Sequence, residues 1–77
     1  MPSEPARPRD AAAWLELVTD AERRGELLRA FDLAERGLAA HPRDVALKHT
    51  AVLALARAGA TDEAARRFEE YGLGGNE

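Results

Sequence analysis

Cysteine and isoleucine are both absent from this chain of 77 residues, and aromatic residues are few: two Phe, one Trp and one Tyr. Without cysteine, neither disulfide bonds nor thiolate-bound metal can stabilise the protein. Val and Thr together supply only six residues, whereas Ala supplies 17 and Leu 10. Because β-branched residues favour strands while Ala, Leu, Glu and Arg favour helices, the composition predicts an all-α fold.

The charge and the short hydrophobic runs exclude further classes of protein. The net charge is −3, from 11 basic and 14 acidic residues, and a mildly acidic domain is a poor candidate for binding a nucleic-acid backbone. The longest apolar run, residues 51–56, is too short to cross a membrane. The first residues contain no apolar core of a signal peptide, so we expect a cytoplasmic protein.

Hydrophobic periodicity of about 3.6 residues predicts four helices, at residues 11–24, 26–40, 45–58 and 61–71. We expect residues 1–10, which contain three prolines, to form a disordered lead, and residues 74–77 to form a frayed tail. The loops between the helices are short, so neighbouring helices should be antiparallel.

The residues at the predicted helix ends are of types that commonly begin or end a helix. Asp10 and Asp44 are favoured N-caps, and we expect Thr61 to cap the fourth helix. Gly25 and Gly59 each follow a helix, where glycine reaches the left-handed conformation without a steric penalty. The second helix should end before Pro42, because the residue that precedes a proline is disfavoured in the α region.

The chain also repeats itself with a fixed period. Three pairs of like residues have one and the same spacing, namely Asp10 and Asp44, Gly25 and Gly59, and Ala30 and Ala64. Each glycine falls between two predicted helices, and each alanine lies early in the second helix of its pair. Such self-similarity indicates a short solenoid built from two helix-turn-helix units.

These residues carry a resemblance to a known family. The first unit contains Trp14-x2-Leu17, then Ala30 and then Pro42, and the second contains Ala64-x3-Phe68. The chain therefore resembles the tetratricopeptide repeat (TPR), a helix-turn-helix unit whose period of about 34 residues is also the spacing of the three pairs. It departs from the family pattern at five positions, which are Val18, Ala21, Ala34, Lys48 and Ala51.

The resemblance implies a helical domain over residues 11–73, with repeat one at about 11–44 and repeat two at about 45–73. Ala30 and Ala64 would then be small because the two helices of a pair approach closely there. Trp14 and Phe68 would be the large side chains that fill the space between the helices. All four would be scaffold residues rather than ligand-binding residues.

The resemblance also implies a function, as a protein-interaction or scaffold module that binds a peptide or a partner helix. In the TPR family the first helix of each pair lines a groove. The corresponding residues here are Leu15, Thr19, Glu22 and Arg23 with Ala12 in the first unit, and His49, Leu53 and Arg57 with Ala46 and Ala56 in the second. The family's Lys and Asn carboxylate clamp has no counterpart among them, so an amphipathic helix with some acidic character is the expected ligand.

No set of residues in the sequence predicts catalysis or a cofactor. There is no cysteine nucleophile, and Ser3 has no base near it in sequence. His41 and His49 are eight residues apart with Pro42 between them, a spacing that does not place two metal ligands on one helix face. We therefore expect a protein that is not an enzyme and that binds no metal, cofactor, nucleic acid or membrane.

The sequence leaves two alternatives to groove binding open. The fourth helix ends with Phe68, Tyr71 and Leu73, and two repeats are few for burying a continuous core. These three residues are therefore candidates for end-on association, either in a small regulatory or assembly domain that self-associates or with further repeats. Residues 49–61 and the helix after them are similar to helical repeats of some bacterial multidomain proteins, so the chain could instead be the non-catalytic repeat portion of such a protein.

Overall fold

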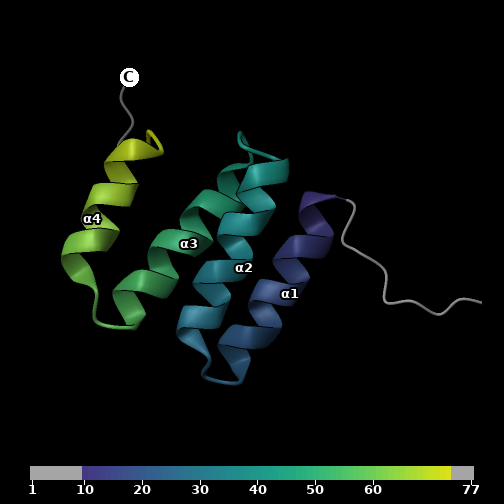
Figure 1. The fold of residues 1–77 in the computed structure, drawn as a ribbon, viewed down its shortest axis with the longest axis horizontal. Helices are drawn as coiled ribbons and strands as arrows, with labels where there is room; N and C mark the ends of the chain where they lie inside the picture. The colour runs from purple at the N-terminus through teal and green to yellow at the C-terminus, as the bar shows by residue number, and fades with distance from the viewer. Residues whose placement is uncertain (1–9, 74–77) are drawn as a thin grey trace, which may run out of the picture.

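The structure is a computed structural model that describes residues 10–73, and within this range the chain forms four helices and no strand (Figure 1). The helices are α1 (Ala11–Arg23), α2 (Leu27–Ala40), α3 (Val45–Arg57) and α4 (Thr61–Glu70). The all-α class and the arrangement in helical hairpins are confirmed. The disordered lead expected for residues 1–9 and the frayed tail expected for 74–77 lie outside the described residues.

Two of the helices begin at an aspartate cap, as the sequence predicts. The side chain of Asp10 accepts a hydrogen bond from the amide of Ala13, and that of Asp44 accepts one from the amide of Leu47, both at 2.9 Å. These carboxylates satisfy amide groups that the first helical turn leaves without a partner. The two caps are one sequence period apart, so the repeat extends to the bonding at the helix ends.

The expectation that Thr61 caps the fourth helix is wrong. Ala60 occupies the N-cap position of α4 and makes no side-chain cap, and Thr61 is already the first helical residue. The amide of Ala60 donates to the carbonyl of Leu55 at 2.9 Å, so α4 begins directly from the turn that ends α3. Asp62 and Glu63 in the first turn of α4 favour the positive end of the helix dipole.

The turns within the two hairpins have the same construction. Gly25 has φ of 79° and Gly59 has φ of 92°, both in the left-handed region that only glycine adopts without strain. After each glycine an amide donates back to a carbonyl of the preceding helix, from Glu26 to Ala21 and from Ala60 to Leu55, both at 2.9 Å. This is the Schellman pattern, which closes a helix and reverses the chain.

The helices pack mainly against their neighbours in sequence. α1, α2 and α3 contact one another, and α4 packs against α3. A single valine and five alanines from α1, α2 and α3 form the buried cluster at the centre: Val18, Ala21, Ala30, Ala34, Ala51 and Ala54. Side chains this small let helix axes approach closely, because the spacing of two helices depends on the side chains at the contact.

One contact between helices leaves little room for a side chain larger than that of glycine. Gly37 is buried on α2, and a Cβ atom placed on it would lie 3.0 Å from Cβ and Cγ of Trp14 and 3.0 Å from Cδ1 of Leu47. Trp14 belongs to α1 and Leu47 belongs to α3, so Gly37 lies where α1, α2 and α3 meet. Trp14 is therefore a large side chain in the helix packing, the place that the resemblance implied for it.

None of the four helices within residues 10–73 is both long enough and apolar enough to cross a membrane.

Replacing Gly37 by Val should lower the free energy of unfolding by about 2–3 kcal/mol, because an overpacked core typically costs about 1–3 kcal/mol and the Cβ and ring atoms of Trp14 have little room to move. The matched control is Ala39→Val, at an exposed position of the same helix, which should cost only about 0.6 kcal/mol of helix propensity. Denaturant unfolding followed by the fluorescence of Trp14, the single tryptophan, measures both variants. Equal losses in the two variants would contradict the proposed close contact at Gly37.

Candidate partner-binding surface

The structure brings the candidate groove residues of α1 and α3 side by side. α1 and α3 are in contact, and the carboxylate of Glu22 on α1 forms an ion pair with the guanidinium of Arg57 on α3 at 3.8 Å. Five of the seven candidates are exposed and two, Leu15 and Glu22, are half-buried. We call this set the α1–α3 surface; it comprises Leu15, Thr19, Glu22, Arg23, His49, Leu53 and Arg57.

Glu22 is the least accessible charged group of this surface. Its side chain is 18% exposed, and one carboxylate oxygen, Oε2, is buried with no hydrogen-bond partner among the described residues. The other oxygen faces Arg57, whose positive charge compensates for part of the desolvation. Glu22 and Arg57 thus neutralise each other, and Arg23 leaves the surface with an excess of positive charge.

Leu53 supplies the exposed hydrophobic part of the surface. Its side chain is 48% exposed, and the neighbouring positions on the same side of α3, Ala46 and Ala56, are also exposed. His49 lies one turn before Leu53 and is exposed as well. The surface therefore offers one large hydrophobic side chain among small ones, flanked by a histidine and two arginines.

A shallow hollow follows α1 and overlaps the α1–α3 surface in part. The described residues that line it are Ala12, Leu15, Glu16, Leu17, Thr19, Asp20 and Arg23. Three of them, Leu15, Thr19 and Arg23, belong to the α1–α3 surface. Glu16, Leu17 and Asp20 lie outside that set, so the hollow extends around α1 beyond the residues expected to line the groove.

The three candidates for end-on association have different environments. Phe68 is 37% exposed, although the resemblance implied that it would fill the space between helices. Tyr71 is half-buried and packs against the central cluster. Leu73 is half-buried, and its amide donates to the carbonyl of Phe68 at 3.1 Å in the turn after α4. Of the three, Phe68 is the most accessible.

Arg67 is the centre of a polar cluster that sequence reasoning missed. Its Nε donates to Glu63 at 3.0 Å, and its Nη1 donates to Glu35 on α2 and to the hydroxyl of Tyr71 at 3.3 Å. The guanidinium carbon lies 5.2 Å from the centroid of the Phe31 ring, within cation–π distance. The sequence does predict the pair of Glu63 with Arg67, four residues apart on one helix. It carries no signal for the contact of Arg67 with Glu35 on α2.

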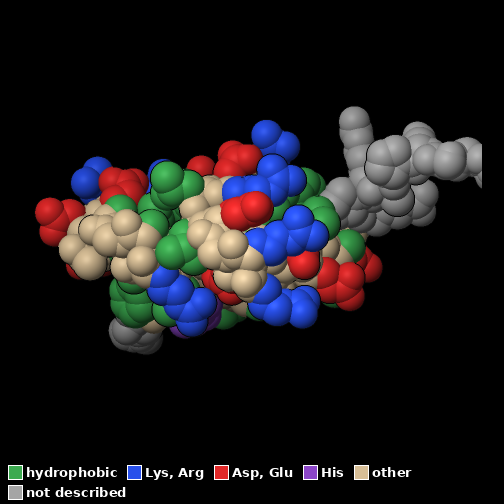
Figure 2. All heavy atoms as spheres, turned by 90° about the horizontal axis from the view of Figure 1, so that it is seen from below, with side chains coloured by type: hydrophobic (Ala, Val, Ile, Leu, Met, Phe, Trp, Pro, Cys, Tyr) green, Lys and Arg blue, Asp and Glu red, His purple; other side chains and the backbone are tan. Residues whose placement is uncertain are grey.

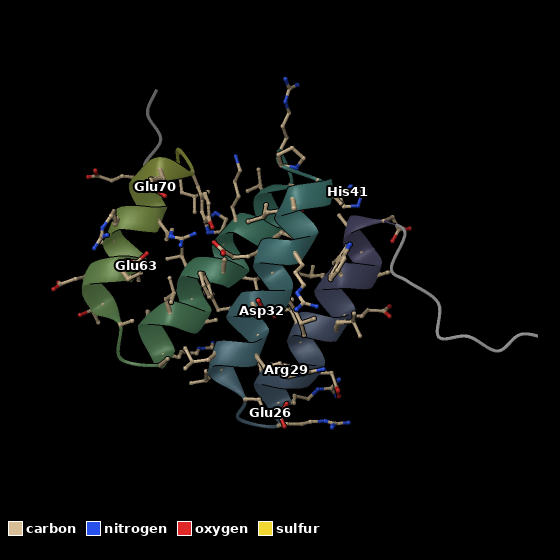
Figure 3. The ribbon with its side chains drawn as sticks, viewed as in Figure 1. Glu26, Arg29, Asp32, His41, Glu63 and Glu70 are labelled. Carbon is tan, nitrogen blue, oxygen red and sulfur yellow. The ribbon has the colours of Figure 1, made fainter. Side chains whose placement is uncertain are left out.

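The cluster keeps Arg67 charged. The hydrogen bond with Glu63 is the main cause that raises the pKa of Arg67, and the bonds with Tyr71 and Glu35 act in the same direction. In Figure 3, Glu63 and Glu70 lie along α4 on either side of this position, and Glu70 is 4.0 Å from Arg67. Since α2 and α4 do not approach each other closely along their backbones, Arg67 is the main tie between them.

Several charges elsewhere on the surface are paired locally. Arg29 pairs with Glu26 and Arg36 with Asp32 along α2, and Glu26, Arg29 and Asp32 follow one another in Figure 3. On the face of the molecule seen in Figure 2, acidic and basic side chains are interspersed with hydrophobic ones.

The histidines lie apart and form no cluster of ligands. His41 is at the end of α2, where its amide donates to the carbonyl of Gly37, and His49 faces outward on α3. In the described part of the chain, no group of three or more His, Cys, Asp or Glu side chains is placed to hold a metal ion.

Comparison with known proteins gives no relative: no family model matches the sequence, and neither the curated proteins nor the solved structures show a significant similarity to it.

Replacing Arg67 by Ala should lower the free energy of unfolding by about 1–2 kcal/mol, because charge-assisted hydrogen bonds are stronger than neutral ones but part of the cluster is exposed. The neighbouring Arg66→Ala is the control, since Arg66 is 61% exposed and, among residues 10–73, pairs only with Glu63. Amide hydrogen exchange should show the loss of protection concentrated in α4. Loss of protection spread evenly over all four helices would contradict the role of Arg67 as the tie between α2 and α4.

Burial, the main cause, raises the pKa of the Tyr71 phenol above its ordinary value of 10.0. Because the folded protein holds this proton more tightly than the unfolded chain, Tyr71 should contribute stability that is complete below pH 10 and is lost as the pH rises through its folded pKa. The chain has a single tyrosine, so ultraviolet absorbance titration reports on it directly. We expect a midpoint above the one measured in denaturant; equal midpoints would contradict the buried position. The Tyr71→Phe variant should lack this part of the alkaline destabilisation.

Proposed function

We propose that this chain is a TPR-like protein-interaction module, which binds an amphipathic, acidic segment of a partner protein along the α1–α3 surface. The observation that carries the proposal is the placement of Leu53, 48% exposed, on a surface that α1 and α3 form together and that bears Arg23, Arg57 and His49. A hydrophobic side chain of the partner would cover Leu53, and its carboxylates would meet the arginines.

Two features support the TPR-like part of the proposal. The N-caps Asp10 and Asp44 and the glycine turns at Gly25 and Gly59 are each separated by the same sequence period, and the members of each pair make the same hydrogen bonds. Ala30 and Ala64, which the resemblance places at close helix contacts, are both buried. In such a scaffold the first helices of successive units share one surface, as α1 and α3 do here.

The charge of the surface favours an acidic partner over a basic one. Glu22 is already paired with Arg57 and is mostly buried, whereas Arg23 is exposed and takes part in no ion pair among the described residues. An acidic segment would gain mainly from Arg23, because the charge of Arg57 is already compensated by Glu22. A basic segment would meet the same arginines at the cost of like-charge repulsion.

A display library of helical peptides with Leu at helical spacing and Glu at the remaining positions should yield binders, whereas the matched library with Lys in place of Glu should not. The double variant His49→Glu with Leu53→Glu should weaken binding of a selected peptide by more than about tenfold, because burying a Leu side chain contributes about 1.5–3 kcal/mol and each 1.4 kcal/mol is a factor of ten.

The control for this experiment is Leu28→Glu. Leu28 is 67% exposed on α2, which contributes no residue to the α1–α3 surface. Isothermal titration calorimetry of the three proteins gives the affinities, and circular dichroism checks that each stays helical. Binding retained in full by the double variant would rule out the α1–α3 surface as the binding site. An equal preference for the Lys library would rule out an acidic partner.

A further inference from the structure

Equivalent positions of the two helical hairpins differ in burial at two places. The first unit (α1 and α2) and the second unit (α3 and α4) correspond by the sequence period that separates the two N-caps, so Ala34 matches Phe68 and Leu17 matches Ala51. Ala34 and Ala51 are fully buried in the same cluster, where the two units meet. Their counterparts are large hydrophobic residues that remain accessible, Leu17 at 42% and Phe68 at 37%.

Phe68 belongs to a face that repeats the one by which the first unit contacts the second. On α2, Phe31 and Glu35 are half-buried beneath Arg67 of the second unit. Their counterparts on α4, Ala65 and Glu69, are both exposed. We call Ala65, Phe68 and Glu69 the trailing face. It is the contact side of a unit that, in this chain, has no following unit among the described residues.

Leu17 belongs to the complementary face at the other end. On α3, Ala51 and Ala54 are buried in the central cluster with residues of the first unit, and Thr50 beside them is half-buried. The counterparts on α1 are Glu16, Asp20 and Leu17, and all three are exposed and line the hollow along α1. We call these three residues the leading face. The hollow therefore lies on the side of α1 that corresponds to the contact side of α3.

The two faces also carry unused charges of opposite sign. Arg23, beside the leading face, is the counterpart of Arg57, which pairs with Glu22 across the two units. Glu69, on the trailing face, is the counterpart of Glu35, which pairs with Arg67 across the units. Among the described residues neither Arg23 nor Glu69 takes part in an ion pair. By the same correspondence, the residues that would face Arg23 and Glu69 in a stacked copy are Ala56 and Leu33. The stacked contact would therefore repeat the hydrophobic part of the internal contact but neither of its ion pairs.

We propose that a second copy of this chain is the occupant of these faces, stacked head to tail so that Phe68 of one copy enters the hollow beside Leu17 of the next. Phe68 and Leu17 replace the two alanines of the internal contact, so they hold the helices of the two copies further apart. The contact is therefore looser than the internal one and forms at high protein concentration. It joins two different faces, so it does not close at two copies.

Sedimentation velocity over rising concentration tests this arrangement. The average mass of the wild-type chain should rise from 8.4 kDa and pass the mass of two chains without reaching a plateau there. Leu17→Glu disrupts only the leading face, and Phe68→Glu disrupts only the trailing face. Because the contact needs one intact face of each kind, each variant alone should stay a monomer. Mixed together, they should form a complex of two chains and nothing larger, because one intact pair of faces remains.

The control is Leu53→Glu, a change of the same kind at a side chain that is 48% exposed. Thr19, the counterpart of Leu53, stays exposed in the first unit, so Leu53 lies outside the trailing face. This variant should self-associate like the wild type while losing affinity for the acidic peptides. Stacking and the α1–α3 binding surface can therefore fail independently of each other.

Three results would overturn the proposal. The first is a wild-type chain that remains a monomer at every concentration. The second is association that survives Leu17→Glu but not Phe68→Glu, which would indicate a two-fold contact between trailing faces. The third is a mixture of the two variants that stays monomeric. Circular dichroism monitors folding. If either Glu variant loses helicity, the single variant Leu17→Ser or Phe68→Ser takes its place.

Discussion

The close approach of helices through alanine and glycine is the constraint on which this structure depends. Five of the six residues in the central cluster are alanines, and a Cβ atom added to Gly37 would lie only 3.0 Å from Cβ and Cγ of Trp14. Small side chains remove little apolar surface from water, so the gain must come from dense packing of many atoms at short range. The half-buried Phe31, Leu33, Leu38 and Tyr71 pack against this cluster, and the fully buried Leu47 lies beside Gly37. The same close spacing places α1 and α3 side by side and so creates the surface proposed for binding.

Features that depend on local chemistry could be predicted from the sequence. The caps at Asp10 and Asp44 and the turns at Gly25 and Gly59 follow from a few adjacent residues, and the structure confirms all four. The prediction that Thr61 caps α4 was wrong for a local reason as well. The amide of Ala60 donates to the carbonyl of Leu55, so α4 begins directly after the turn that ends α3. The accessibility of Phe68 could not be predicted, since it depends on what packs against α4. The candidate surface could be chosen only through a family resemblance, and its pairing of Glu22 with Arg57 needed the structure.

Arg67 shows how a polar group can replace a missing backbone contact. α4 packs on α3, and its only link to α2 in the described structure is made by long side chains that meet around one guanidinium. Glu35, Glu63, Tyr71 and the face of Phe31 converge on Arg67, so four residues from α2, α4 and the turn after α4 share one positive charge. A hydrophobic residue at position 67 could not satisfy Glu35, which is why this cluster must be kept or replaced as a whole.

The order of the helix contacts has a consequence for folding speed. α1 packs on α2, α2 on α3 and α3 on α4, so most contacts join residues that are near in sequence. The loops that must close are short, and closing them costs little chain entropy. Helical domains dominated by such local contacts fold within microseconds to milliseconds. α4, which packs on α3 and reaches α2 through Arg67, has the fewest contacts with the other helices of the described chain.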